Sequence, residues 1–327
     1  MRELSIIMPY FNEGAEFIRE TIDNIHSTCD VDHEIIIVDD CSGSPLVTNG
    51  ARVLRHSENL GVGAAFDTAV RVSDSEYLFL MGCDVRFIAN RWASKMIKEI
   101  NDHPYSLICT SVVHLDWDNP ILTFEMSRQN FVYNGATILV AYGGKNGERD
   151  ILHAQWLPRF SRLVEPDIET KCKALSSYGV IPSETQSYEV PCILGAAYGV
   201  RKGWYEYIDG FWGHKKWGTL EPYISLKSWM FGGNCLTAPH IETAHKFKSS
   251  GEKDGNCLAY NAMLIPWLLF ESKDKNKLVD WMNHPAKYPA LQMIEENISD
   301  IYAKRKEYKR KIMKPFNELS QQFKLNY

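Results

Sequence analysis

The feature that most constrains this chain is an alternation, along its first 87 residues, of short apolar runs with stretches of helical periodicity. The apolar runs occupy residues 4–10, 33–40, 51–57 and 77–87. Between them, residues 15–28 and 63–73 carry apolar side chains at helical spacing, which predicts two helices. Strands joined by helices in units of about thirty residues form crossovers between parallel strands. The sequence therefore predicts an α/β fold with a mainly parallel sheet flanked by helices.

The composition narrows the class of protein. The 327 residues are 45% hydrophobic and 24% charged, which is enough to bury a full core. A formal net charge of -5 and a pI of about 6.1 exclude a surface that is basic all over. The eight cysteines never reach the CxxC spacing of a zinc or redox site, so we expect a reduced, cytoplasmic protein.

No stretch of the sequence has the length of a membrane span. The apolar run at the N-terminus is too short for a secretory signal. The most apolar later segment, residues 262–270, contains Pro266 and is far shorter than the roughly 20 residues that cross a bilayer. We expect no transmembrane segment, so a lipid acceptor would be met at the membrane surface.

Polar residues directly follow the predicted strands. They lie at 9–13, at 39–42 and at Asp84. In open parallel sheets, ligands bind at the carboxyl ends of the strands. The sequence therefore predicts a ligand site at this edge of the sheet, with Asp84 projecting from the end of a buried strand.

Four motifs, "SIIMPYFNE", "EIIIVDDCSG", "ENLGVGAAFDTAV" and "EYLFLMGCDV", occur in order within residues 3–88. In this order and spacing they resemble the nucleotide-sugar-binding half of the GT-A glycosyltransferases, especially glycosyltransferase family 2. The resemblance implies a Rossmann-like GT-A sheet and transfer of a sugar from a nucleotide-sugar donor, such as a UDP-sugar, to an acceptor hydroxyl.

The resemblance also implies which residues hold the nucleotide. They are Pro9, Tyr10, Glu13, Asp39, Asn59 and Gly63. Asp39 matches the acid that bonds the uracil ring, although a carboxylate at a strand end can also cap a turn. Gly63 and the neighbouring Gly61 match a loop in which glycine lets the backbone approach the nucleotide.

A metal site is implied at the end of the fourth strand. Family members carry Asp-x-Asp there, whereas this chain reads Gly82, Cys83, Asp84. Asp84 matches the direct ligand of a divalent ion, Mn²⁺ or Mg²⁺, and loss of the first acid puts the metal affinity in question. A second ligand is expected at His245, since "AHKF" resembles a motif of the polypeptide N-acetylgalactosaminyltransferases; a structural histidine is the alternative.

The helix predicted at 217–233 carries the candidate base. In family 2 an Asp near the start of this helix activates the acceptor hydroxyl, and the matching residue is Glu221, with Leu220 in place of the preceding acid. A carboxylate within reach of the hydroxyl can accept its proton. Glu221 can also be read as a favourable charge in the first turn of a helix. Trp212, Trp217 and Trp229 lie nearby and can stack on a sugar or pack in the core.

The predicted organisation is a GT-A domain at residues 1–258 and a helical C-terminal extension at 259–327. The first 100 residues form the nucleotide-sugar-binding half, and residues 101–258 form the acceptor half. The segment 304–314 holds seven Lys or Arg residues, which most often form a solvated helix face but can contact a polyanion. Asp116 and Asp118 are expected in a loop.

Several alternatives stay open from the sequence. The acceptor can be a saccharide, a protein, a lipid or modified DNA, and the DNA case would be a phage-type enzyme acting on hydroxymethylated bases that are flipped into the cleft. A degenerate glycosyltransferase that only binds is suggested by Gly82 and Leu220. A nucleotidyltransferase is less well supported, because the segment after the first strand lacks a glycine-rich, lysine-bearing loop. The mixture of motifs also leaves the anomeric outcome open.

Overall fold

The computed structural model describes residues 2–114, 132–143, 147–157, 179–181, 183, 186–246 and 254–325. Its strands are β1 (Leu4–Tyr10), β2 (His33–Asp39), β3 (Arg52–Arg55), β4 (Tyr77–Met81), β5 (Val85–Phe87), β6 (Ser106–His114), β7 (Val132–Tyr133), β8 (Ala136–Gly143), β9 (Arg149–Trp156), β10 (Tyr188–Glu189), β11 (Ala197–Arg201) and β12 (Asn234–His245). Its helices are α1 (Ala15–Thr28), α2 (Val62–Val72), α3 (Trp92–Asp102), α6 (Lys202–Tyr207), α7 (Leu220–Met230), α8 (Gly255–Leu269), α9 (Ser272–Trp281), α10 (Lys287–Glu296), α11 (Ile298–Tyr308) and α12 (Phe316–Gln322). The predicted Asp116 and Asp118 loop lies outside the described residues.

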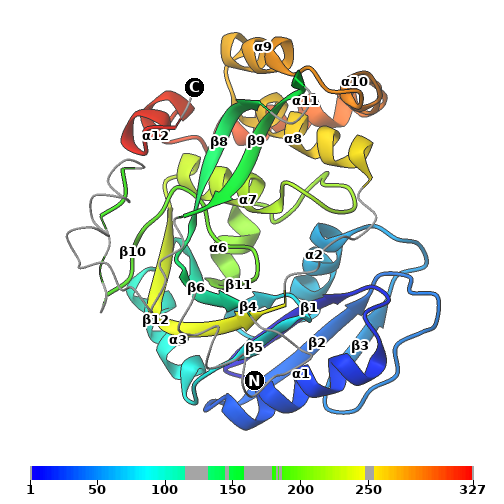
Figure 1. The fold of residues 1–327 in the computed structure, drawn as a ribbon, viewed down its shortest axis with the longest axis vertical. Helices are drawn as coiled ribbons and strands as arrows, with labels where there is room; N and C mark the ends of the chain where they lie inside the picture. The colour runs from blue at the N-terminus through cyan, green and yellow to red at the C-terminus, as the bar shows by residue number, and fades with distance from the viewer. Residues whose placement is uncertain are drawn as a thin grey trace.

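A ten-stranded sheet forms the centre of the molecule, with its main path in the order β10-β12-β6-β11-β4-β1-β2-β3. Strands β1 to β4 pair in parallel, as predicted, and β11 is antiparallel to both of its neighbours. Helices α1 and α3 cover one face, and α2, α6 and α7 cover the other (Figure 1). Because both faces are covered, the strands read as continuous apolar runs rather than alternating ones. The predicted fold class is confirmed.

Helix α7 is a core helix rather than a surface helix. Every residue from Pro222 to Met230 is buried, and the helix contacts β6 and β12 of the sheet as well as α8. Pro222 lies in the first turn, where the missing N–H costs nothing. The N-terminal end of α7 is therefore held rigidly at a fixed place above the sheet.

The residues directly before β11 support the edge of the cavity without forming a strand of their own. Only Ala197–Arg201 forms a strand, while the residues before it run as an irregular segment. This segment joins the hairpin through Cys192 and Ala136, whose backbone N–H groups donate to each other's carbonyl oxygens over 3.0 and 2.8 Å. These bonds satisfy the backbone in place of a sheet neighbour.

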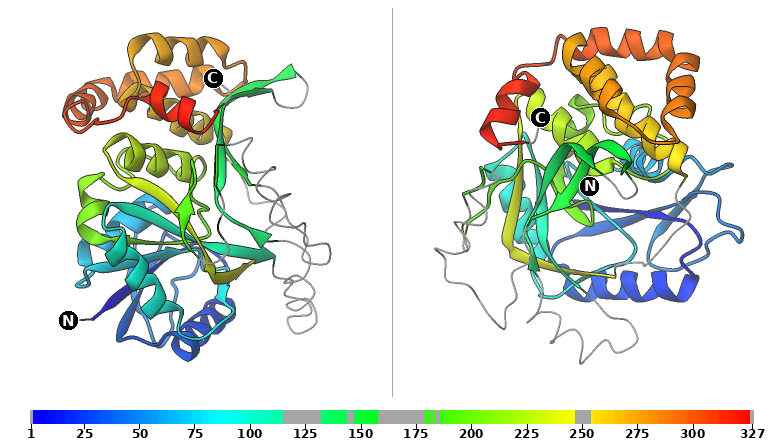
Figure 2. Two further views of the ribbon diagram at one scale, coloured as in Figure 1. Left: turned by 90° about the vertical axis from the view of Figure 1, so that its left-hand side faces the viewer. Right: turned by 45° about the horizontal axis from the view of Figure 1, so that its top comes forward.

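Two further features differ from the sequence prediction. The first is a hairpin that was not predicted, and the second is the helical extension, which begins earlier than predicted. Strands β8 and β9 form a two-stranded hairpin that runs from the sheet toward the C-terminal helices (Figure 2), where β9 contacts α8 and α9. The helical extension begins at Gly255, with Asp254 accepting hydrogen bonds from Asn256 N and Cys257 N as its N-cap. No helix among the described residues is long and apolar enough to cross a membrane.

Candidate active site

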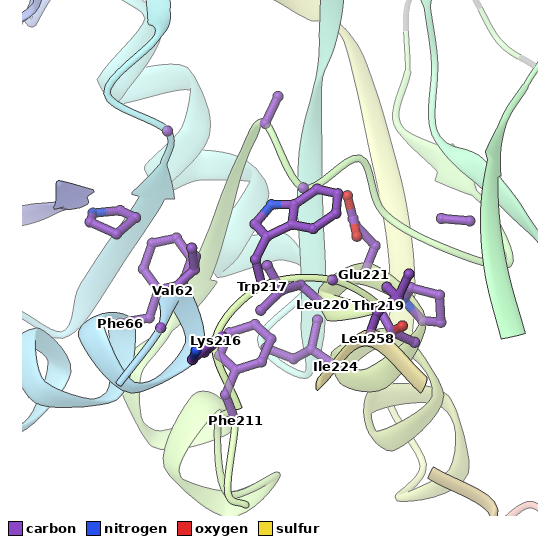
Figure 3. A pocket seen from close by; sticks show the side chains of 18 of the residues that line it. Val62, Phe66, Phe211, Lys216, Trp217, Thr219, Leu220, Glu221, Ile224 and Leu258 are labelled. Carbon is purple, nitrogen blue, oxygen red and sulfur yellow. The ribbon is translucent and has the colours of Figure 1, made fainter. Parts of the chain in front are cut away.

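A cavity of about 1990 Å³ opens at the carboxyl ends of β1, β2 and β4. One part of its lining, here called the strand-end side, comes from the loops that follow these strands and β3 and consists of Pro9, Tyr10, Phe11, Asn12, Glu13, Asp40, Asn59, Gly61, Gly82, Cys83 and Asp84. A second part, the hairpin side, comes from β7 to β9 and consists of Tyr133, Tyr142, Leu152, His153, Ala154 and Trp156. The N-terminal end of α7 lies in the same lining, and Figure 3 shows Trp217 and Glu221 pointing into the shared space.

The loop after β1 is shaped by hydrogen bonds within itself and to the loop after β2. Asn12 has a positive φ of 62°, its N–H donates to Ser42 Oγ over 3.0 Å, and its Oδ1 accepts from Gly43 N over 2.9 Å. The hydroxyl of the buried Tyr10 accepts from Gly14 N over 3.2 Å. The predicted binding residues Pro9, Tyr10 and Glu13 all line the cavity.

Asp39 requires a correction, because it lies behind the cavity rather than in its lining. It is fully buried, and its oxygens accept hydrogen bonds from Ser42 N, Leu46 N and the guanidinium of Arg55. Burial alone would raise the pKa of this carboxyl, but the hydrogen bonds hold the pKa below its usual value. With its acceptor positions already used, Asp39 is suited to shaping the loop rather than to bonding a base.

The neighbouring Asp40 is the acid that lines the cavity. It accepts from Leu60 N over 2.9 Å and from Gly61 N over 2.7 Å, and its Oδ1 lies 2.7 Å from His56 Nδ1. The predicted Asn59 also lines the cavity. Asp40 thus fixes the loop that begins α2 at the edge of the site.

Gly63 also requires a correction, since Gly61 is the glycine in the cavity lining. A Cβ on Gly63 would lie 2.7 Å from Phe211 Cβ, so this glycine permits helix packing. Gly61 has a φ of +96°, and a Cβ there would lie 2.1 Å from the backbone of Lys216. The close approach at Gly61 lets Lys216 pair with the loop, its carbonyl accepting from Val62 N over 3.1 Å.

Asp84 lies between β4 and β5 and lines the cavity. A Cβ on Gly82 would lie 2.3 Å from Asp84 Oδ1, so the carboxylate occupies space that any other residue at position 82 would enter. A side chain at position 82 would therefore require the Asp84 carboxylate to turn aside. Cys83 is 3% exposed, and its carbonyl accepts from Thr21 Oγ1 over 2.6 Å, which anchors the turn on α1.

His245 lies beside Asp84, with His245 Nε2 3.4 Å from Asp84 Oδ1. The two meet because β12 pairs antiparallel with β5, which places His245 opposite Val85. The other histidine of this strand, His240, instead lies 3.3 Å from Glu99 on α3. No group of three or more His, Cys, Asp or Glu suited to a metal occurs among the described residues.

Glu221 lines the cavity from the first turn of α7. A Cβ on Gly195 would lie 2.7 Å from Glu221 Oε1, so the carboxylate packs directly on the irregular segment before β11. Burial raises the pKa of Glu221, and the charge of His245 opposes that shift. A carboxylate with a raised pKa is suited to accept a proton near neutral pH.

The aromatic residues of the hairpin side were missed by sequence reasoning. The Trp156 ring lies 4.8 Å from the Tyr133 ring at an interplanar angle of 77°, and 6.3 Å from the His245 ring. Tyr142 and His153 have ring centroids 5.2 Å apart. Of the three predicted tryptophans near α7, Trp217 is 49% exposed and lines the cavity, whereas Trp229 is buried. The sequence gives no compositional signal for them, because the share of Phe, Trp and Tyr in residues 133–156 is close to the 12% of the whole chain.

Among the described residues, the lining of the cavity is acidic. These residues include five carboxylates and one lysine, namely Glu13, Asp40, Asp84, Glu221, Asp254 and Lys216. The lysine Nζ lies 3.2 Å from Asp254 Oδ2, so its charge is already balanced. Such a lining favours a cation and disfavours a polyanion.

Comparison with known proteins gives one family and a fold. The model of the family described as glycosyl transferase family 2 matches residues 5–147. No curated protein matches the sequence. Among solved structures, the chain is similar to GalNAc-T7 with UDP, GalNAc and Mn²⁺, with a TM-score of 0.67 and 14% identity over 98% of this chain and 56% of that one.

A second solved structure is the mannosyltransferase PcManGT from Pyrobaculum calidifontis with GDP-Man and Mn²⁺, with a TM-score of 0.47 and 14% identity over 91% of this chain and 75% of that one. This chain spans about half of the length of GalNAc-T7, 56%. The predicted resemblance is confirmed at the level of the fold. The chain has a GT-A glycosyltransferase fold similar to that of family 2, and the family 2 model matches its residues 5–147.

Proposed function

We propose that this chain is a glycosyltransferase that transfers a sugar from a nucleotide-sugar donor to an acceptor hydroxyl. One observation carries the proposal: the adjacent pair Asp84 and His245 lines the same cavity as Glu221. This placement supports assigning the site of the leaving diphosphate and the base for the acceptor to one cavity. The donor is proposed to be UDP-linked, since the chain shares its fold with a UDP-bound structure.

The residues at the strand end fit a divalent ion. Asp84 offers a carboxylate oxygen and His245 an imidazole nitrogen on neighbouring strands, a donor set that suits Mn²⁺ better than Ca²⁺. When bound, such an ion would neutralise the charge of the leaving diphosphate. Diphosphate oxygens and water would complete its shell.

Glu221 has the central role in the transfer. The acceptor oxygen forms a bond to the anomeric carbon, and the bond from that carbon to the phosphate oxygen breaks with its electron pair on the leaving group. The acceptor proton passes to the carboxylate of Glu221, which is suited to take it because burial raises its pKa. Gly195 keeps the carboxylate in place, and the buried helix α7 holds its backbone.

The phage-type DNA alternative is less well supported by the contacts in the structure than by the sequence alone. The basic segment 304–314 forms contacts within the chain: Lys304 bonds Asp209 and Glu307, and Arg305 donates to the carbonyl of Trp267. None of its seven basic residues lines the cavity, and the lining is acidic. A polyanionic acceptor would be repelled there. The binding-only alternative is distinguished by hydrolysis of the donor in the absence of an acceptor.

A reducing, cytoplasmic setting belongs to the same proposal. It is supported by the seven cysteines of the described residues, all of which are free thiols. The predicted boundaries at residues 100 and 258 also remain proposals. The boundary at residue 258 does not separate the cavity from the extension, because Asp254 and Leu258 at the start of the extension line the cavity.

Thermal unfolding with a panel of nucleotide sugars tests the donor site. We expect one UDP-sugar with Mn²⁺ to raise the melting temperature by several degrees, because a ligand at 100 times its Kd adds about 2.7 kcal/mol of stability. Asp84→Asn is expected to abolish the Mn²⁺-dependent part of this rise in melting temperature. The control Asp280→Asn changes an exposed carboxylate on α9 and should keep the full shift. The absence of a shift with every nucleotide sugar would contradict the proposal.

A further inference from the structure

The hairpin side of the cavity consists mostly of rings. Of its six lining residues, four carry rings with a polar edge, namely Tyr133, Tyr142, His153 and Trp156. The Trp156 ring lies 6.3 Å from that of His245, and His245 lies against Asp84. An unbroken set of ring contacts therefore leads from the proposed diphosphate site onto the hairpin.

The rings continue along the hairpin away from the diphosphate site. Trp156 and His153 are three residues apart on β9, a separation of roughly 10 Å at about 3.3 Å per residue. Tyr142 on β8 lies against His153, with ring centroids 5.2 Å apart. The positive φ of 54° at Leu152 marks an irregularity in β9 just before His153, on the side away from Trp156. Trp156, His153 and Tyr142 all line the same cavity, so more than one unit of a bound chain can meet a ring there.

The size of the cavity indicates that it holds a second substrate as well as the donor. A pocket for one small ligand has a volume of about 300–1,000 Å³, whereas this cavity measures about 1990 Å³. The hairpin side lies beyond the strand ends that are proposed to hold the donor. The remaining volume is therefore available to an acceptor of several rings.

The chemistry of the lining selects among acceptor classes. Lys216 is paired with Asp254, and the described lining holds four further carboxylates, which disfavour nucleic acid and other polyanions. Aromatic faces bind the apolar faces of sugar rings, while Tyr hydroxyls and imidazole or indole nitrogens can bond sugar hydroxyls at the ring edge. An alkyl chain needs no such polar edges. A neutral saccharide matches both properties of this wall.

We propose that the acceptor is a neutral oligosaccharide whose terminal ring stacks on Trp156 and whose next units run along β8 and β9 past His153 and Tyr142. This inference rests on the proposed glycosyltransferase function and identifies its acceptor class. The stacked ring presents its hydroxyl to Glu221, which lines the same cavity. Trp156 is thus an acceptor-binding residue in this proposal.

The experiment compares Trp156→Ala and Trp156→Phe with native protein in two assays. The first measures donor binding by thermal shift and donor hydrolysis without an acceptor. The second measures nucleotide release with neutral mono-, di- and trisaccharides, chosen by binding to an array of neutral glycans. The matched control is Trp281→Ala, since Trp281 is 38% exposed and stacks on Arg149 of the same strand but lies outside the cavity lining.

We expect Trp156→Ala to raise the acceptor KM about 10-fold, the effect of losing one aromatic contact of roughly 1.4 kcal/mol. The change in acceptor KM should exceed any change in donor binding or donor hydrolysis. Trp156→Phe should recover most of the affinity, and Trp281→Ala should behave as native. The acceptor KM should also fall from mono- to trisaccharide, and His153→Ala should reduce that gain. His153 is exposed on β9, so its replacement tests the wall even if Trp156→Ala unfolds.

The failure of this inference is distinguishable from the failure of the proposed function. If no nucleotide sugar binds or is hydrolysed, the glycosyltransferase proposal fails and the acceptor inference fails with it. If the donor binds but no neutral glycan does, or if only a hydroxyl peptide, a lipid or hydroxymethylated DNA stimulates nucleotide release, the acceptor inference alone is overturned. An unchanged acceptor KM in both Trp156→Ala and His153→Ala would also overturn it.

Discussion

The strand-end side of the cavity is made of loops that each follow a parallel strand, whereas the hairpin side is made of strands that leave the main sheet. On the strand-end side, backbone hydrogen bonds and carboxylates define the surface, as Asp40 does with Leu60 N and Gly61 N. On the hairpin side, ring contacts such as that between Tyr133 and Trp156 define it. The first arrangement follows from topology, because parallel strands bring their carboxyl ends to one edge. The second depends on side chains that no sheet rule specifies.

Glu221 stands where the two sides meet, and its replacement is expected to have the largest effect. Glu221→Gln should lower kcat about 10²- to 10⁴-fold, the usual range for loss of a general base, with the donor-induced thermal shift retained. In the native protein, activity should rise with pH as Glu221 loses its proton, at a pH above the usual carboxyl range because burial raises its pKa. The activity of Glu221→Gln should lack this rise with pH. An unchanged kcat would remove Glu221 from the chemistry.

Gly195→Ala tests whether the segment before β11 positions the base. The new Cβ would lie 2.7 Å from Glu221 Oε1, so the carboxylate must move. We expect kcat to fall about 100-fold, since a shift of about 1 Å at a reacting group can cost that much. Donor binding should persist, measured as the Mn²⁺-dependent thermal shift. A matched change is Gly203→Ala, where a Cβ meets nothing within 4 Å, and a similar loss there would contradict the positional explanation.

On the strand-end side, Gly61→Ala should destabilise the protein by about 3 kcal/mol. It combines a φ of +96° with a Cβ placed 2.1 Å from the Lys216 backbone, so both conformational strain and separation of two segments contribute. The control Gly14→Ala has almost the same φ, +97°, with nothing within 4 Å, and should cost only about 1–2 kcal/mol. Urea unfolding measures both. Equal losses in the two variants would mean that the contact with Lys216 contributes nothing.

The substitution Gly82→Asp distinguishes two opposite expectations for metal binding, one from family resemblance and one from the geometry of the site. By family resemblance, the new acid restores Asp-x-Asp and should strengthen metal binding. By geometry, a side chain at position 82 begins 2.3 Å from Asp84 Oδ1 and brings a like charge beside it. We expect Mn²⁺-dependent donor binding to weaken about 10-fold, measured by calorimetry. Tighter binding would show that Asp84 can turn aside without loss.

The same contrast explains how much could be predicted from the sequence. Strands β1 to β4, the position of Asp84 after β4 and the helix that bears Glu221 follow from periodicity and motif order, because each depends on neighbours along the chain. The exchange of Asp39 for Asp40 in the lining was not predictable, since adjacent acids at a strand end point to different sides and only packing decides which of these two buried acids lines the cavity. The hairpin side depends on pairing between β8 and β9 and on contacts with α8 and α9. Such long-range contacts leave only a weak local signal.

A pH-dependent effect on stability is expected at the far end of α7, where Lys227 links this helix to the C-terminal extension. Lys227 is fully buried and donates to the carbonyl oxygens of Asp209 and Gly210. Asp209 in turn bonds Tyr308 and Lys304 of α11. Burial lowers the pKa of Lys227 to about 7, against the opposing charges of Asp209 and Asp67.

The sign of the pH effect follows from that shift. The unfolded chain keeps the proton on this lysine up to its model value of 10.5, whereas the folded chain releases it near pH 7, so folding releases a proton between these values. The contribution to stability is full above pH 10.5 and is lost as pH falls through 7.

Over this window the free energy of unfolding of the native protein should rise with pH more steeply than that of Lys227→Met, by up to about 1.4 kcal/mol per pH unit. Urea unfolding at pH 7 to 9.5 measures the slopes, with Lys273→Met on the exposed part of α9 as the control that should match native. Equal slopes in all three proteins would mean that Lys227 stays charged in the folded chain, and the helix that carries Glu221 would then be tied to the extension by an ion rather than by a neutral amine.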